Sequence, residues 1–232
     1  HIFVTNQGNH VAVNKCKISS SLFQGTRIEG TGGDAYNCII SNSVILRNGD
    51  DGIFCRGLDA QKGSTVEDGY ANAIITNNIV SHSAGYGIHC KGQSNTAQLY
   101  SDNDPSRFNQ GVASPRIENN LITANGSGGI RCNAEGFFMG FWGYGYAKGI
   151  SEPLIQKNLI YGNLKAGIEV QGSTPDIFTL LLSTLMILTP EIYNNPFWNN
   201  AGIDLKIKAD CDSTGFKIIN NIFAQSDTCI FK

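Results

Sequence analysis

Ionisable residues recur in this chain one or three positions after the Ile of a Gly-Ile pair. The candidate site residues among them are Arg56, His89, Lys91, Arg131, Glu169 and Asp204. Two consecutive carboxylates, Asp50 and Asp51, come just before one pair in the motif GDDGI. Carboxylates, an imidazole and fixed cations are the groups that move protons and bind anions. Because only 16% of the residues are charged, this concentration indicates either an active-site groove or a solvated face held by salt bridges.

The Gly-Ile pairs belong to an internal repeat. The units read NNIVSHSAGYGIHCKG (77–92), NNLITANGSGGIRC (119–132), KNLIYGNLKAGIEV (157–170), NNPFWNNAGIDL (194–205) and NNIFAQSDTCIF (220–231). Each unit has three short apolar segments without helical periodicity, one before the Asn pair, one after it and one starting at Gly-Ile. Three short strands per stacking unit predict a coil of parallel strands. Asn tolerates the left-handed corner, and its amide would bond to the corners above and below, so we expect Asn ladders rather than catalytic Asn residues.

Strand alternation then orients the side chains after each Gly-Ile pair. Ile points inward, so the next residue points outward. The expected outward row is Glu29, Phe54, His89, Arg131, Glu169 and Asp204, and a second row is Arg56, Lys91, Asn133, Gln171 and Lys206. Cys55, Cys90 and Cys132 would form an interior stack, because neighbouring parallel strands lie about 4.8 Å apart. We expect these thiols to be reduced and to fill the core as small apolar side chains. No Cys or His spacing typical of a metal site occurs.

This repeat resembles the right-handed parallel β-helix of the pectate-lyase-like superfamily. The resemblance covers nearly the whole chain and implies an all-β solenoid of about seven coils, with residues 1–232 forming one domain. A leucine-rich repeat lacks support, and an antiparallel sandwich would not repeat its sequence in this way. The resemblance also favours a polysaccharide as partner and a secreted or cell-surface location. It does not select an activity, because the fold serves lyases, hydrolases, phage spikes and adhesins.

Two reactions on an acidic polysaccharide suit the outward rows. Eliminative cleavage needs a cation and a base, for which Arg56, Lys91, Arg131 and His89 are candidates, and Asp50 or Asp51 would hold Ca²⁺. Hydrolysis needs two carboxyl groups. Glu169 and Asp204 are expected on adjacent coils, roughly 5 Å apart, the separation found in retaining hydrolases.

A narrower resemblance concerns three motifs. GDDGI (49–53), GYGIHCKG (85–92) and GIRC (129–132) are similar to the Gly-Asp-Asp, Gly-His-Gly and Arg-Ile-Lys series of polygalacturonases. This resemblance implies that Asp50 and Asp51 are catalytic acids and that Arg131 contacts substrate. Tyr86 stands where that family has His, and no Asn-Thr-Asp occurs around Ile28.

Long segments follow several of the Gly-Ile strands, at 57–73, 92–115, 133–153 and 171–190. They leave the same corner of successive coils and are expected to build a wall beside the outward rows. One contains GFFMGFWGYGYAKG, in which Phe141, Trp142, Tyr144 and Tyr146 would form either a sugar platform or a packed core. Another contains the apolar run 177–188, which is too short to span a bilayer at roughly 20 residues and is expected to pack over the coil or between subunits.

Three classes of function stay open: a carbohydrate-active enzyme, a carbohydrate-binding or adhesion module, and a structural β-helix. No basic run indicates nucleic acid. The chain begins at His1, so we expect a processed or trimmed start. Neither end carries an evident polar cap, which predicts either a piece of a longer protein or a homo-oligomer formed through an end or the apolar insertion.

Overall fold

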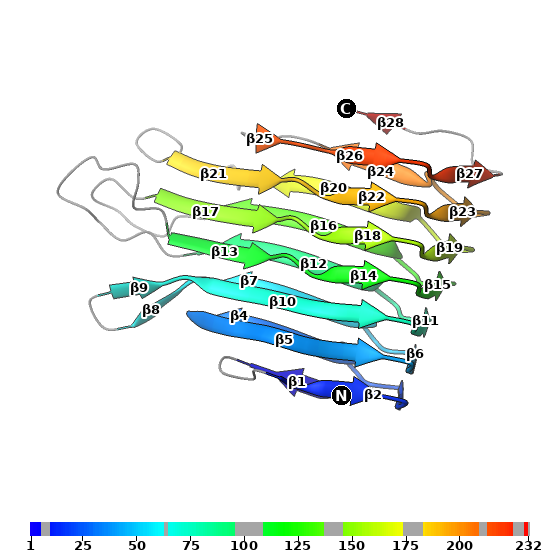
Figure 1. Ribbon diagram of the computed structural model, residues 1–232, viewed down its shortest axis with the longest axis horizontal. Helices are drawn as coiled ribbons and strands as arrows, with labels where there is room; N and C mark the ends of the chain where they lie inside the picture. Colours follow the sequence, from blue (N-terminus) through cyan, green and yellow to red (C-terminus); the bar gives the residue numbers. More distant parts are fainter. Residues whose placement is uncertain are drawn as a thin grey trace.

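The fold was analysed in a computed structural model, which describes residues 1–5, 10–62, 65–95, 109–136, 146–173, 183–208, 213–224 and 230–231. Within these residues the chain forms three parallel sheets and one antiparallel hairpin. Figure 1 shows the strands of successive coils stacked on one another, from the blue N-terminal coil to the red C-terminal coil. The predicted parallel β-helix is therefore confirmed.

The three sheets correspond to the three apolar segments of the repeat. Sheet 1 contains β1 (Ile2–Val4), β4 (Thr26–Thr31), β7 (Ile53–Leu58), β12 (Tyr86–Ser94), β16 (Gly128–Gly136), β20 (Ala166–Ser173), β24 (Leu205–Lys208) and β28 (Ile230–Phe231). Sheet 2 contains β2 (Ala12–Asn14), β5 (Gly33–Ser41), β10 (Gly69–Thr76), β13 (Asn109–Ala113), β14 (Arg116–Glu118), β17 (Tyr146–Ser151), β18 (Leu154–Gln156), β21 (Ser183–Leu188), β22 (Glu191–Tyr193), β25 (Ser213–Thr214) and β26 (Lys217–Ile219). Sheet 3 contains β3 (Lys17–Ser19), β6 (Val44–Leu46), β11 (Ile79–Ser81), β15 (Leu121–Thr123), β19 (Leu159–Tyr161), β23 (Pro196–Trp198) and β27 (Ile222–Ala224).

The Asn pairs occupy the corner between sheets 2 and 3. The first residue of each pair has a positive φ, as at Asn119 (54°) and Asn194 (53°). The second residue accepts a hydrogen bond from the preceding coil, so that the Asn120 N–H donates to Asn158 Oδ1 at 3.0 Å. The same bond recurs at Asn78, Asn120, Asn158, Asn195 and Asn221, which confirms the predicted ladder.

The interior of the coil is filled by the inward residues of all three sheets. Ile53, Ile88, Ile130 and Ile168 of sheet 1 are fully buried, as strand alternation predicts. Cys55, Cys90 and Cys132 lie in register beside one another, buried and without disulfides, so the predicted thiol stack is confirmed. Burial raises the pKa of Cys55 and of Cys132 to about 12.

The described parts of the long insertions fold as strands. β8 (Ala60–Lys62) and β9 (Thr65–Glu67) form the antiparallel hairpin, whereas β13, β17 and β21 extend sheet 2 behind the long strands of sheet 1. The two sheets meet there at glycines, since a Cβ on Gly57 would lie 2.0 Å from the Val112 carbonyl oxygen and one on Gly92 would lie 1.7 Å from that of Ile150. The remaining parts of the long insertions, 96–108, 137–145 and 174–182, lie outside the described residues. The expected wall beside the outward rows therefore stays a prediction.

The apolar run 177–188 is described from Ser183 onward, where it forms β21. Met186 and Leu188 of this strand are buried in the core. This part of the run is therefore a strand of the coil itself, which differs from both expectations, packing over the coil and packing between subunits. No helix in the part of the chain that the structure describes is both long enough and apolar enough to cross a membrane.

Candidate active site

The register of sheet 1 brings most of the predicted outward row together. Phe54 of β7, His89 of β12, Arg131 of β16 and Glu169 of β20 are direct neighbours on adjacent strands. Two positions further along, Arg56 is beside Lys91 in the second row. Five of the six candidates expected to share this face therefore do so, and the exception is Asp204.

The prediction for Asp204 is wrong. Leu205, not Ile203, pairs with Ile168, so the outward residue beside Glu169 is Lys206. Asp204 is fully buried, and its Oδ1 accepts a hydrogen bond of 2.7 Å from Asn200 Nδ2. Asn200 is the last Asn of a second ladder, which runs through Asn125 and Asn163, and Asp204 terminates it. The predicted retaining pair of Glu169 and Asp204 consequently does not exist.

Glu29 was expected in the first outward row, but the structure places it in the second row. It pairs with Arg56 across β4 and β7, and Arg27 takes the position beside Phe54. The strand is entered two residues earlier than the Gly-Ile pattern of the later coils indicates, because this coil has Gly-Thr at Gly25-Thr26 instead.

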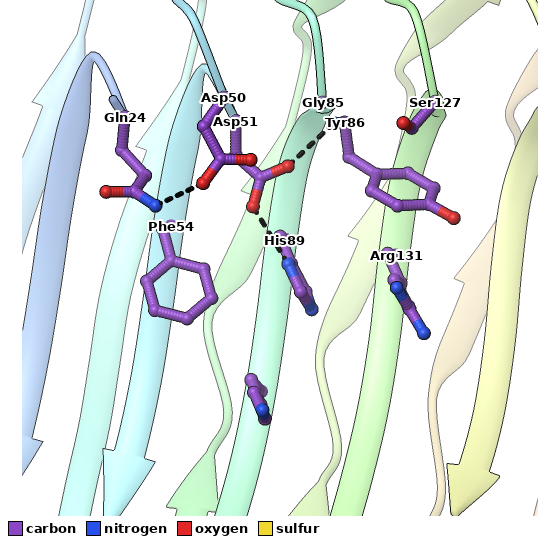
Figure 2. Close-up of a pocket in the computed structure, with 10 residues that line it drawn as sticks. Gln24, Asp50, Asp51, Phe54, Gly85, Tyr86, His89, Ser127 and Arg131 are labelled. Carbon is purple, nitrogen blue, oxygen red and sulfur yellow. Dashed lines mark hydrogen bonds and ion pairs between the residues drawn. The ribbon is translucent and has the colours of Figure 1, made fainter. Parts of the chain in front are cut away.

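A cavity of 320 Å³ lies on the outward face where β7, β12 and β16 begin. Figure 2 shows its side chains converging from these three strands, from the corners before them and, for Gln24, from the corner before β4. The lining residues are Gln24, Asp50, Asp51, Phe54, Gly85, Tyr86, His89, Lys91, Ser127 and Arg131. The cavity thus joins five of the predicted site residues, Asp50, Asp51, His89, Lys91 and Arg131.

Asp51 is held by two hydrogen bonds at the corner before β7. Its Oδ1 accepts from the Tyr86 N–H at 2.6 Å, and its Oδ2 is 2.9 Å from His89 Nδ1. The carboxylate therefore fixes both the orientation and the tautomer of the His89 ring. The other ring nitrogen, Nε2, is buried and has no hydrogen-bond partner among the described residues.

Asp50 lies beside this pair and accepts a hydrogen bond of 2.5 Å from Gln24 Nε2. Burial raises the pKa of Asp50, and the neighbouring Asp51 carboxylate raises it further, outweighing the lowering by Gln24 and His89. Two adjacent carboxyl groups that share a site tend to differ in protonation. Asp50 thus retains its proton to higher pH than an ordinary aspartic acid does.

Tyr86 forms the wall of the cavity toward the C-terminal coils. Its register partner is Gly128, where a Cβ would lie 2.9 Å from the Tyr86 ring, so the missing side chain lets the ring cross β16. The Tyr86 hydroxyl donates to Glu169 Oε2, and the Arg131 guanidinium lies 5.4 Å from the ring centroid. Sequence reasoning noted Tyr86 only as a departure from polygalacturonases. The signal that could have identified it is an aromatic residue in register with glycine.

Most of the cations on this face are neutralised. Lys91 pairs with Glu135 at 2.7 Å, and Lys206 pairs with Glu169 at 2.7 Å. Arg56 pairs with Glu29 at 2.7 Å. Arg131 forms no ion pair within the described residues; it donates to the Gln171 amide oxygen at 3.1 Å. Salt bridges thus occupy much of this face, as one of the two expectations stated, and a cavity opens beside them. Among the cations that line the cavity, Arg131 is the one without an ion pair in the described residues.

The structure describes none of the aromatic side chains of the segment GFFMGFWGYGYAKG (136–149). Phe141, Trp142 and Tyr144 lie outside the described residues, and Tyr146 is described only as the first backbone position of β17. Within the described chain no three His, Cys, Asp or Glu side chains are grouped to hold a metal. Asp50 and Asp51 alone offer few of the six to eight oxygen ligands that Ca²⁺ takes. Ca²⁺ binding stays a prediction.

No family model matches the chain, and no curated protein matches it. A solved structure named "Glycoside hydrolase" is similar, with a TM-score of 0.35 and 11% sequence identity over 85% of this chain. The similar region is 38% of that structure, so this chain spans well under half of its length. At this identity and TM-score the similarity assigns no activity.

Proposed function

We propose that this chain is a glycoside hydrolase that cleaves an acidic polysaccharide in the cavity around Asp50 and Asp51. The observation that carries the proposal is the meeting of these two carboxyl groups in one cavity, with the pKa of Asp50 raised. Hydrolysis of a glycosidic bond needs a protonated acid beside an ionised carboxylate. The resemblance to the pectate-lyase-like superfamily, and to polygalacturonases at Asp50, Asp51 and Arg131, points the same way.

The two aspartates would divide the reaction between them. Asp50 donates its proton to the glycosidic oxygen as the bond to the anomeric carbon breaks. Asp51, held by the Tyr86 N–H and by His89, accepts a proton from the water whose oxygen bonds to that carbon. One water is consumed, a new reducing end forms, and proton exchange with solvent restores both carboxyl groups.

Arg131 supports an anionic sugar as the substrate. Among the cationic side chains that line the cavity it is the one without an ion pair in the described part of the chain, and stacking on Tyr86 limits its motion. A guanidinium in such a place can bind a sugar carboxylate through two parallel hydrogen bonds. The Tyr86–Glu169 hydrogen bond holds the ring, and therefore the guanidinium, against the edge of the cavity.

A second candidate is eliminative cleavage of a uronate polymer, favoured by the bond between His89 and Asp51. An imidazole oriented by a carboxylate, whose second nitrogen has no partner among the described residues, suits a base that removes the proton beside a carboxylate. Arg131 would then neutralise that carboxylate. The two reactions differ in their products, because elimination leaves an unsaturated sugar that absorbs in the near ultraviolet.

The test is a screen of polygalacturonate, alginate and other acidic polysaccharides for new reducing ends and for near-ultraviolet absorbance. Hydrolysis predicts reducing ends without absorbance, and Asp50→Asn should lower kcat by about 100-fold or more, the range for loss of a general acid. Glu191→Gln removes a surface carboxylate of sheet 2 and serves as the control that should keep full activity. Absorbance that depends on His89 would establish elimination instead, and binding without cleavage would indicate a carbohydrate-binding module.

A further inference from the structure

A group of planar side chains continues the outward row beyond the cavity, toward the N-terminal coil. Phe3 of β1, Arg27 of β4 and Phe54 of β7 are direct register neighbours. The Arg27 guanidinium carbon lies 5.1 Å from the Phe3 ring centroid and 5.5 Å from that of Phe54. Arg27 is thus held between two aromatic rings, and Phe3 is half exposed.

This group carries a net positive charge. Glu29 accepts hydrogen bonds from both Arg27 and Arg56, so one carboxylate faces two guanidinium groups. Burial raises the pKa of Glu29, but hydrogen bonds from Arg56, Thr31 and Arg27 outweigh burial and lower it. Glu29 is therefore ionised at neutral pH, and one positive charge is left over. Arg56 Nε is buried without a partner among the described residues, which leaves a donor unused at the same place.

The group is continuous with the cavity through Phe54. This ring lines the cavity and also lies 5.9 Å from the Arg56 guanidinium carbon and 5.0 Å from the His89 ring centroid. Arg27 and Arg131 stand three strands apart, which corresponds to about 14 Å at roughly 4.8 Å per strand. An extended polysaccharide lying along the stack would cover this distance with a few sugar units.

We infer that Phe3, Arg27 and Arg56 form an accessory subsite, which binds a second anionic sugar unit of the polymer whose cleaved bond lies in the cavity. The inference rests on the proposed function for the class of ligand, an acidic polysaccharide. Phe3 provides an exposed ring for the apolar face of a sugar, and the excess guanidinium charge binds its carboxylate. The substrate is therefore a polymer with recurring negative charges, and a very short oligosaccharide cannot reach both Arg27 and Arg131.

The experiment measures binding of sodium polygalacturonate, sodium alginate and the dimers of each by calorimetry, in the Asp50→Asn background to prevent turnover. Arg27→Gln should weaken binding of the preferred polymer about 10- to 100-fold, the range for one charge-assisted contact, and leave the dimer unchanged. Phe3→Ala should weaken polymer binding in the same selective way. Arg116→Gln is the matched control, because Arg116 pairs with Glu118 two residues on, as Arg27 pairs with Glu29, but lies on sheet 2.

Each outcome decides one of the two proposals. Equal polymer affinity for Arg27→Gln and Arg116→Gln, or equal weakening for polymer and dimer, overturns the accessory subsite. Failure of every variant to bind either polymer overturns it as well. Cleavage of the polymer by wild-type protein with no effect of Arg27→Gln leaves the hydrolase standing without the subsite. Arg27-dependent polymer binding without any cleavage by wild-type protein leaves the subsite standing without the hydrolase. The melting temperatures of Arg27→Gln and Arg116→Gln establish that the two variants are equally folded.

Discussion

Replacing Asn158 by alanine should destabilise the coil strongly, because this side chain is fully buried in the middle of the Asn ladder. Its Nδ2 donates to the Ile117 carbonyl at 2.9 Å and to Asn195 Oδ1 at 3.1 Å. Its Oδ1 accepts from Asn120 N at 3.0 Å and from Asn120 Nδ2 at 2.9 Å. The substitution therefore removes four hydrogen bonds and leaves their partners buried.

At about 1 kcal/mol per hydrogen bond, the loss amounts to about 4 kcal/mol of unfolding free energy. For a domain of this size, a change of that amount lowers the melting temperature by roughly 8–16 °C. Urea denaturation followed by circular dichroism measures the free energy, and thermal melting measures the temperature shift.

The matched control is Asn221→Ala, at the C-terminal end of the same ladder. Asn221 has equivalent bonds, from the Asn195 N–H and Nδ2 and to the Ile192 carbonyl. It is only partly buried, so water can replace the lost partners, and we expect a loss of about 1 kcal/mol. A cost for Asn158→Ala that is below 1 kcal/mol, or equal to that of Asn221→Ala, would refute the argument that the buried ladder stabilises the coil.

Three further predictions follow from the same structure. The raised pKa of Asp50 keeps this acid protonated above the ordinary value of 3.8, so hydrolysis should decline with rising pH only above that value, and a pH–rate profile whose alkaline limb lies below it would contradict the assignment. Burial raises the pKa of Cys55 to about 12, so iodoacetamide should label the exposed Cys16 in the native protein and Cys55 only after denaturation, as peptide mass spectrometry would detect. Gly92→Ala would place a Cβ 1.7 Å from the Ile150 carbonyl oxygen and force the two sheets apart, so soluble yield or melting temperature should fall sharply; a melt like that of wild type would contradict this close packing.

Much of the fold could be predicted because its determinants are local and repeat. An inward Ile88 and Cys90 require only strand alternation, which has a period of two residues. The Asn corners require only residues that tolerate positive φ and an amide that repeats in register, as Asn120 and Asn158 do. A pattern that recurs once per coil therefore predicts both the sheets and the side of each strand that faces outward.

The register of the terminal coils could not be predicted from the same pattern. Gly202-Ile203 repeats the letters of the earlier Gly-Ile pairs, yet at this corner Asn200 bonds to Asp204 and the strand begins only at Leu205. Strand pairing across coils, rather than the local sequence, sets the register. An error of two residues keeps the alternation intact but changes every neighbour, so Lys206 replaced Asp204 beside Glu169.

The sequence by itself determined the parallel coil, its Asn ladders, its thiol stack and the face on which Asp50, Asp51, His89 and Arg131 gather. Each of these follows from residue type and a regular spacing along one chain. Only the tertiary structure decided which charges neutralise one another, that Tyr86 crosses Gly128 to reach Glu169, and that Asp50 has a raised pKa. The physical reason is that these properties depend on distances between side chains of different coils and on burial from water, and neither is encoded in the spacing of residues along the chain.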